Sequence, residues 1–276
     1  MFRKTSGAIL CPSCGRLTNA DAPVCLVCGR RNPGMWGFAG AFRKVFGPRS
    51  YTQTITVVCI VLYLVSLVFD PAGALRPRGP FDIFSPSGAA LDALGMTGAH
   101  AWYRGQWWTL FTSIYLHGSL LHILFNVLWI RQLGPAVEDL YGSARFFVIF
   151  TAAGVAGFVV SNVLSGYPTV GASGSIFGLL GAIVAFGRKR GGTFGAMVLR
   201  QYGQWALILF LMGLFMGGMV NNIAHAGGFV GGFLAGLVMS LAEHRAETTG
   251  DRMLASLCAV MTVAAFGLAL WTSFAG

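Results

Sequence analysis

Long apolar segments, separated by polar or glycine-rich stretches, dominate the pattern of this chain. Seven such segments lie near residues 54–70, 119–134, 146–166, 172–187, 204–220, 223–241 and 253–273. A helix needs about 20 mostly apolar residues to cross the hydrocarbon core of a bilayer. Several of the segments are shorter than this or rich in glycine. The pattern predicts a polytopic membrane protein with seven transmembrane helices.

The ends of the chain differ from this apolar region. Residues 1–34 are polar, basic and rich in Gly, Pro and Cys, and a basic stretch follows them. We therefore expect an N-terminal module at 1–34, a linker at 35–53, a membrane core at 54–245 and an extra transmembrane helix at 246–276. No apolar stretch precedes residue 34, so we do not expect a cleavable signal peptide.

Composition agrees with a membrane protein. Hydrophobic residues make up 55% of the chain and charged residues 10%, whereas a soluble domain carries roughly 25% charged residues. The net charge of +10 could suggest nucleic acid. The basic residues lie at segment ends rather than on one face, which is typical of membrane topology. We expect no nucleic-acid partner.

The distribution of basic residues orients the predicted helices. With the N-terminus in the cytoplasm, sixteen Lys and Arg residues fall inside and only Arg76, Arg78 and Arg104 fall outside. Loops on the cytoplasmic side carry the excess of Lys and Arg, so the C-terminus is expected outside. The first outer loop, residues 71–118, ends in aromatic residues typical of the membrane interface, and we expect short helices there.

Four polar side chains fall near the outer ends of three predicted helices. Ser173 opens one segment, His225 opens another, and His122 and Asn126 share one face of a third. Polar residues inside a membrane are costly and usually face a cavity or a partner. Their common depth predicts a functional site.

Stripes of small residues indicate how this site closes. One segment reads Gly227-Gly228-x-x-Gly231-Gly232-x-x-Ala235-Gly236, and another contains Gly174-x-x-x-Gly178. Small residues at this spacing let two helix backbones approach closely in lipid. If the two segments pack by these faces, Ser173 and His225 come within hydrogen-bond reach.

This arrangement suits nucleophilic catalysis. A serine hydroxyl needs an adjacent base, and His225 can take its proton and later protonate a leaving amine. Side chains of His122 and Asn126 and the backbone N–H of Ser173 could stabilise an oxyanion. No carboxylate lies at the outer ends of the Ser173 and His225 segments, so we expect a dyad, with Phe177 orienting the imidazole.

Taken together, these residues resemble the rhomboid family of intramembrane serine proteases over roughly residues 50–245. The motifs that carry the resemblance are Gly171-Ala172-Ser173-Gly174, His117-Gly118-Ser119, His122-x-x-x-Asn126, Gly134-Pro135-Ala136-Val137-Glu138 and His225 ahead of a glycine-rich segment. The resemblance implies an all-α polytopic fold, with a six-helix core and a seventh C-terminal helix.

The resemblance also implies an activity and its residues. The family hydrolyses peptide bonds in or near the transmembrane helices of membrane-protein substrates, with small residues at the cleaved bond. Ser173 and His225 would form the dyad, His122 and Asn126 would serve the oxyanion, and Phe177 would stack on the histidine, with Gly171 and Gly174 supporting the serine. Catalysis needs no cofactor. We expect the bacterial inner membrane, whose lipids surround the protein.

This chain departs from the family pattern at one position, and two other functions are alternatives to a protease. The family often has Trp-Arg in the first outer loop, where this chain has Trp108-Thr109, so the arginine's structural role is absent or falls to Arg104. A catalytically inactive relative that binds transmembrane clients would have lost Ser173 or His225, and both are present. A transporter or channel would favour charged residues within the segments or an inverted repeat, and neither is found.

The N-terminal cysteines suggest a metal site. Cys11, Cys14, Cys25 and Cys28 form two C-x-x-C pairs, each followed by glycine, and resemble a zinc ribbon with tetrahedral Zn²⁺. Two disulfides are the alternative. A cytoplasmic location keeps thiols reduced and favours structural zinc, in a module that docks a cytoplasmic partner or shapes substrate access. The isolated Cys59 and Cys258 are expected to be small core residues.

Overall fold

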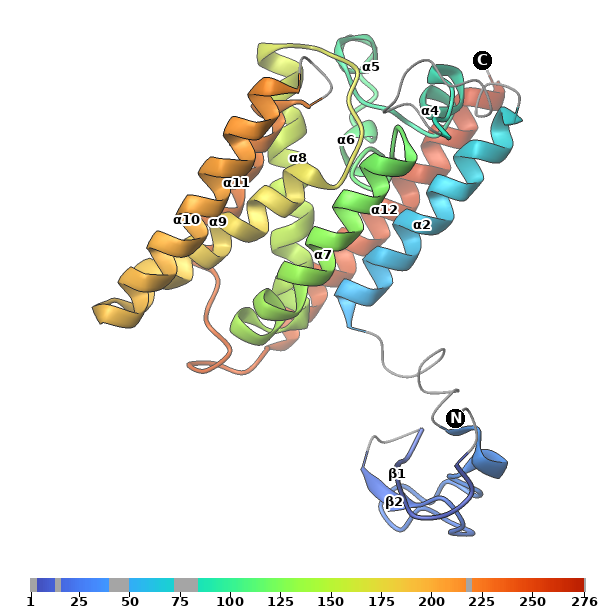
Figure 1. The fold of residues 1–276 in the computed structure, drawn as a ribbon. Coiled ribbons are helices and arrows are strands. Elements are labelled where there is room, and N and C mark those ends of the chain that lie inside the picture. The colour runs from blue at the N-terminus through green and yellow to red at the C-terminus, as the bar shows by residue number, and fades with distance from the viewer. Residues whose placement is uncertain (1–3, 13–15, 40–49, 72–83, 217–219, 276) are drawn as a thin grey trace. The chain divides into compact units, whose positions relative to one another are not determined.

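The computed structural model of the 276-residue chain describes all residues except 1–3, 13–15, 40–49, 72–83, 217–219 and 276 (Figure 1). Cys14 therefore lies outside the described residues, as do Arg43, Lys44 and Arg49 of the predicted linker. The chain divides into two compact units, residues 1–50 and 51–276. Each unit is described by itself below.

A short hairpin organises the small unit. Strands β1 (Ala8–Leu10) and β2 (Leu17–Asn19) pair antiparallel, with Leu10 opposite Leu17. A 3-10 turn, η1 (Met35–Gly37), closes the unit, because the carbonyl of Gly37 accepts the Lys4 N–H at 2.8 Å. The hydrogen bonds of this unit thus extend past residue 34.

Seven long helices form the large unit, and each overlaps one predicted segment. They are α2 (Tyr51–Phe69), α7 (Leu120–Tyr141), α8 (Ser143–Leu164), α9 (Ser173–Arg190), α10 (Gly192–Phe215), α11 (Asn222–Val238) and α12 (Thr249–Ala275). By length and composition, α2, α7, α8, α10 and α12 can cross a membrane. Helix α11 is a shorter apolar helix, and α9 ends in three basic residues. The predicted fold, six helices and a seventh, is confirmed.

Two predicted helix bounds are wrong. Helix α7 continues through Pro135 to Tyr141, because Val137 and Tyr141 beyond the proline are fully buried, and this burial offsets the lost backbone hydrogen bond. Helix α10 begins at Gly192, twelve residues before the predicted start at 204. Glycines at 192 and 195 and the polar residues Arg200, Gln201 and Gln204 interrupt the apolar pattern and hid this extension. A methyl group on Gly195 would overlap the carbonyl oxygen of Gly187 in α9, so the extension packs closely on that helix.

The first outer loop contains the expected short helices. They are α4 (Gly88–Ala93), α5 (Ala99–Tyr103) and α6 (Thr109–Thr112). Buried polar groups tie the loop to α8, since Asn162 Nδ2 donates to Thr97 Oγ1 at 2.8 Å. The Thr109 hydroxyl is buried and donates to the Gln106 carbonyl at 2.8 Å, while Arg104 is exposed.

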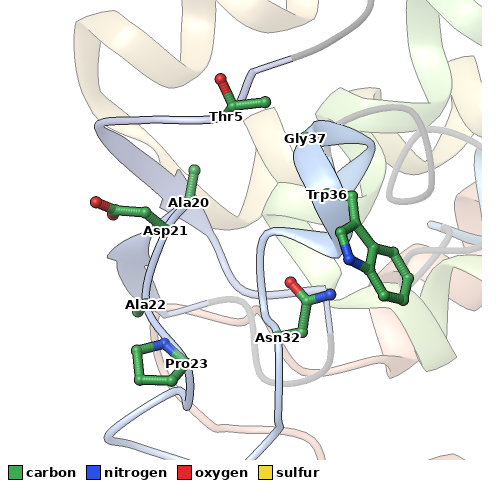
Figure 2. Close-up of a pocket in the computed structure, with 8 residues that line it drawn as sticks. All are labelled: Thr5, Ala20, Asp21, Ala22, Pro23, Asn32, Trp36 and Gly37. Carbon is green, nitrogen blue, oxygen red and sulfur yellow. The ribbon is translucent and has the colours of Figure 1, made fainter.

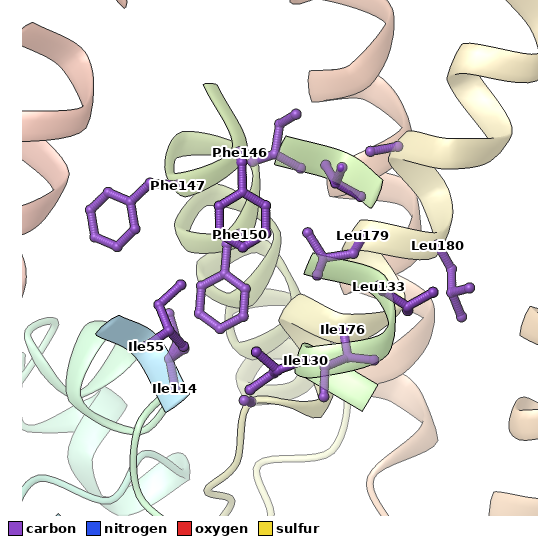
Figure 3. Packing of buried hydrophobic residues seen from close by; sticks show 14 of the residues in the cluster. Ile55, Ile114, Ile130, Leu133, Phe146, Phe147, Phe150, Ile176, Leu179 and Leu180 are labelled. Atoms are coloured by element: carbon purple, nitrogen blue, oxygen red, sulfur yellow. The ribbon is translucent and has the colours of Figure 1, made fainter. Parts of the chain in front are cut away.

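Helices α8, α9 and α11 pack at the centre of the large unit, around a core of aliphatic and aromatic side chains. Figure 3 shows part of this core, with Ile130 and Leu133 of α7, Phe150 of α8 and Leu179 of α9. All four of these side chains are almost completely buried. Dense packing at this level fixes the helices that carry the predicted site.

A buried arginine, Arg145, anchors the N-terminal end of α8 to the connection between α11 and α12. Arg145 has no exposed side-chain surface and donates to the carbonyls of Ser240, Arg245 and Ala246 at 2.9–3.0 Å. Its guanidinium also contacts Asp251 Oδ2 at 2.7 Å. These bonds tie the connection between α11 and α12 to the first turn of α8.

Candidate active site

Close backbone packing of α9 and α11 brings the two halves of the site together. A methyl group on Gly228 would overlap the carbonyl oxygen of Gly174, and one on Gly232 would overlap that of Gly178. Glycine is required at these positions because no other residue permits this approach. On α11, Gly228, Gly232 and Gly236 of the predicted stripe contact α9, whereas Gly227 and Gly231 pack against α8. Helices α9 and α11 lie side by side in Figure 1.

Ser173 is the first residue of α9, and the chain before it is held in a fixed conformation. Gly171 has φ +126°, a value that favours glycine. Its N–H donates to the Ser113 carbonyl at 2.8 Å, which anchors the segment to the end of the first outer loop. The N-terminus of a helix offers unpaired N–H groups and a positive dipole. Ser173 therefore stands where a developing negative charge is favoured.

His225 lies in the first turns of α11 and contacts the serine directly. Its Nε2 is 2.8 Å from Ser173 Oγ, the distance of a good hydrogen bond. The His225 side chain is buried, with its residue 6% exposed. The contact predicted from the glycine stripes is present.

The imidazole is oriented by an aromatic ring. Phe177, one turn after Ser173 on α9, stacks on His225 with ring centroids 4.2 Å apart and an interplanar angle of 16°. His225 Nδ1 is buried and has no hydrogen-bond partner among the described residues, a carboxylate included. The geometry is that of a pair, Ser173 and His225, without a third acidic group.

His122, on α7, also approaches the segment that leads into Ser173. A Cβ on Gly171 would lie 2.6 Å from His122 Nε2, so this nitrogen faces the backbone two residues before Ser173. The Gly118 N–H points to His122 Nδ1 at 3.3 Å. His117, fully buried, sets its ring edgewise against His122 at 5.1 Å between centroids.

For Asn126, the observed hydrogen bond is to its own helix and not to the serine segment. It is buried on α7, one turn after His122, and its Nδ2 donates to the His122 carbonyl at 2.8 Å. Its Oδ1 has no partner in the part of the chain that the structure describes. In this structure the amide nitrogen is engaged within its own helix.

One residue of the site did not emerge from the sequence. Asn221 caps α11 through Oδ1, which accepts the Ala224 N–H at 3.0 Å. Its Nδ2 donates to Ser161 Oγ at 2.6 Å and to Thr169 Oγ1 at 2.8 Å. Asn221 therefore joins the start of the histidine helix to α8 and to the loop before Ser173. The preference of Asn for the cap position, just ahead of an apolar run, is the signal that could have found it.

Three of the four predicted metal ligands lie together in the small unit. The Sγ atoms of Cys11, Cys25 and Cys28 all lie within 4.8 Å of one another. The Cys11 and Cys28 sulfurs are 3.7 Å apart, which is too long for a disulfide of about 2.05 Å. It matches the separation of about 3.8 Å between two thiolates bound tetrahedrally at 2.3 Å. Backbone N–H groups of Cys28 and then Val27 lower the pKa of the Cys25 thiol to about 6, which favours the thiolate that metals bind.

A cavity of about 330 Å³ lies in the small unit, and two of its lining residues, Pro23 and Asn32, flank the Cys25–Cys28 turn in the sequence. Figure 2 shows the residues around it, among them Thr5, Asp21, Asn32 and Trp36. None of the four polar residues predicted for catalysis contributes to it.

Sequence comparison identifies the family to which this chain is similar. The sequence model of the family described as Rhomboid domain matches residues 104–242. "Rhomboid protease GluP" of Bacillus subtilis is 39% identical over 168 residues, covering 59% of this chain and 32% of GluP. "Putative rhomboid protease YdcA" of the same organism is 34% identical over 136 residues, 46% of this chain and 66% of YdcA.

A relative from another organism covers more of the chain. "Rhomboid protease GlpG" of Salmonella typhi is 29% identical over 209 residues, 73% of this chain and 68% of GlpG. The present chain thus spans about a third of the length of GluP and about two thirds of YdcA and GlpG. The family match covers half of the chain and includes all four polar residues of the site. This protein is an integral membrane protein and belongs to the rhomboid family.

Proposed function

We propose that this protein is an intramembrane serine endopeptidase. It hydrolyses peptide bonds in or near transmembrane helices of membrane-protein substrates. The observation that carries the proposal is the 2.8 Å contact between Ser173 Oγ and His225 Nε2, formed by two tightly packed helices. The family membership and the similarity to GluP and GlpG, both named rhomboid proteases, support the same activity.

The geometry suggests the order of proton transfers. Ser173 Oγ attacks the scissile carbonyl carbon while His225 Nε2 takes the hydroxyl proton. The tetrahedral intermediate collapses, the C–N bond breaks, and the proton on His225 passes to the leaving amine. A water molecule then attacks the acyl-serine ester, with His225 again accepting and returning a proton. The cycle ends with a carboxylic acid product and free Ser173.

Three groups are proposed to stabilise the oxyanion. The backbone N–H of Ser173 stands at the start of α9, where the helix dipole favours negative charge. His122 Nε2 faces the Gly171 backbone beside the serine. Asn126 lies one turn further along α7, and its amide must turn from the His122 carbonyl to contribute.

Phe177, Gly171 and Gly174 are proposed as supporting residues. Phe177 fixes the plane of the imidazole by stacking, in place of the carboxylate that a triad would use. Gly171 leaves room for His122, and Gly174 admits the backbone of α11 at Gly228. Substrates are proposed to have small residues at the cleaved bond and a locally unwound helix.

The orientation in the membrane is also part of this proposal. The bias of Lys and Arg supports a cytoplasmic N-terminus, an outer C-terminus and a dyad in the outer half of the bilayer. The bacterial inner membrane is the proposed location. The module at 1–34, linker at 35–53, core at 54–245 and extra helix at 246–276 are the proposed domains.

The small unit is proposed to hold a structural Zn²⁺ ion, with no cofactor serving catalysis. Cys11, Cys25 and Cys28 have the donor chemistry and spacing for it, and Cys14 is the proposed fourth ligand. The ion would link the hairpin of β1 and β2 to the Cys25–Cys28 turn. It would thereby stabilise a unit that has few apolar core residues. Elemental analysis should find zinc in the purified protein and none in Cys11→Ser, whereas Cys59→Ala, in α2, should retain it. Zinc-free wild-type protein would contradict the site.

The activity is tested with a model transmembrane substrate reconstituted in liposomes. Wild-type protein should cleave it, whereas Ser173→Ala and His225→Ala should give no product above background. Equal product from all three proteins would refute the dyad. Binding of the substrate by wild type without cleavage would instead favour an inactive client-binding protein.

A further inference from the structure

Large aliphatic side chains crowd one end of the small unit. Leu26 is 98% exposed, Leu17 71%, Val27 63% and Leu10 46%. Leu10 and Leu17 are cross-strand partners on the hairpin, and Leu26 and Val27 fill the two positions between Cys25 and Cys28. We call these four residues the apolar tip.

The cysteine cluster brings the two parts of the apolar tip together. Leu10 precedes Cys11 and Val27 precedes Cys28, and the sulfurs of these two cysteines are 3.7 Å apart. The end of the hairpin and the Cys25–Cys28 turn are therefore neighbours. Exposed apolar residues gathered in this way mark an interaction surface rather than the scattered exposure normal for a protein.

Charge identifies the kind of partner. Residues 1–50 contain eight of the chain's nineteen Lys and Arg residues but only one carboxylate, Asp21. Arg16, next to Leu17, is exposed, and so is Arg31. The partner must therefore accept aliphatic side chains and attract positive charge. A bilayer surface with anionic headgroups satisfies both requirements.

The chain itself holds the small unit near such a surface. Only residues 40–50 separate Ala39 from the first membrane helix, which begins at Tyr51. Even fully extended, this stretch reaches about 40 Å. Tethering at this distance gives a high effective concentration of lipid, so weak contacts suffice for docking.

We propose that the small unit docks its apolar tip into the anionic headgroup region of the leaflet to which it is tethered. Leu26 and Val27 enter the interface, and Arg16 and Arg31 contact lipid phosphates. Docking is independent of the proposed peptidase activity. Only its assignment to the cytoplasmic leaflet depends on the proposed orientation.

The test uses the full chain in nanodiscs of phosphatidylcholine alone or mixed with phosphatidylglycerol. Amide hydrogen exchange in the segment containing Leu26 and Val27 should slow several-fold when the anionic lipid is present. The segment around Thr5 is the internal control and should be unaffected, because it lies beyond the far end of the hairpin, beside the cavity of Figure 2. The double variant Leu26→Ser with Val27→Ser should lose the effect while retaining the metal content of wild type.

A photo-crosslinking amino acid at position 26 identifies the partner. Adducts with phosphatidylglycerol, absent when the crosslinker replaces Thr5, are the expected result. Identical exchange in both lipid compositions would overturn the proposal. So would adducts formed only with protein, because they would assign the apolar tip to a protein partner or to the large unit.

Discussion

The carbonyl oxygen of Gly174 occupies the space that any side chain on Gly228 would need. Gly174 follows the candidate nucleophile, and Gly228 follows the candidate base by less than one helical turn. The close approach of two backbones therefore sets the distance between Ser173 and His225. A substitution that separates α9 from α11 should therefore also separate Ser173 from His225.

Replacing Gly228 with alanine should separate these helices. The overlap with Gly174 cannot be relieved by a side-chain rotation, so we expect a loss of about 1–3 kcal/mol in unfolding free energy, together with most of the activity. Gly267→Ala is the matched control, because its Cβ in α12 would meet nothing within 4 Å. Thermal unfolding in detergent should show a lower Tm for Gly228→Ala only; equal Tm values would disprove the contact.

Phe177→Leu should lower kcat, because the leucine side chain cannot stack on the His225 ring. An aromatic stack contributes about 0.5–1.5 kcal/mol beyond burial, so losing it should reduce kcat about two- to tenfold. Phe177→Tyr keeps the ring and should retain most activity. Phe150→Leu, in the core of α8, serves as a control that alters stability without altering kcat of the folded enzyme. Unchanged kcat in Phe177→Leu would show that the stack does not position His225.

Substitutions of Asn221 can separate its role as the cap of α11 from its hydrogen bonds to Ser161 and Thr169. Asn221→Ser retains a cap acceptor for the Ala224 N–H but is too short to reach Ser161 and Thr169. Asn221→Ala loses both, and caps of this kind contribute about 0.5–2 kcal/mol. We expect reduced kcat in both variants and a larger fall in Tm for alanine. If serine restores full activity, the bonds to Ser161 and Thr169 do not position the site.

Arg145 should be among the most sensitive residues far from the site. Arg145→Met removes the donor to the carbonyls of Ser240, Arg245 and Ala246. It also removes the 2.7 Å partner of Asp251, which keeps only the more distant Arg245 at 3.6 Å. Because the Arg145 side chain is fully buried, we expect a cost of about 3–5 kcal/mol. The exposed pair of Arg190 and Glu243, 3.2 Å apart, provides the comparison. Arg190→Met should change the unfolding free energy by about 0–1 kcal/mol. Similar effects of both substitutions would contradict the structural role of Arg145.

The sequence predicted the helices and the central contact because both leave periodic patterns. Apolar runs mark membrane helices, and glycines four residues apart mark the faces that bring Ser173 to His225. The Cys11, Cys25 and Cys28 cluster follows similarly from the spacing of two pairs.

Other features depend on partners distant in the chain. Arg145 bonds to carbonyls about a hundred residues away, and carbonyls have no sequence signature. Asn221 likewise contacts hydroxyls more than fifty residues away. The early start of α10 was hidden because Gly192 and Gly195 weaken the helical pattern, whereas the close packing of Gly195 on α9 leaves no signature in the sequence.

Activation of Ser173 as a nucleophile by His225 is the step on which the proposed peptidase activity depends. Its most direct measurement is reaction of the membrane-reconstituted protein with a fluorophosphonate, followed by mass spectrometry of the modified residue. We predict a single adduct on Ser173, strongly reduced labelling in His225→Ala and no adduct in Ser173→Ala. Labelling of Ser173→Ala at the wild-type rate, or an undiminished rate in His225→Ala, would contradict the account.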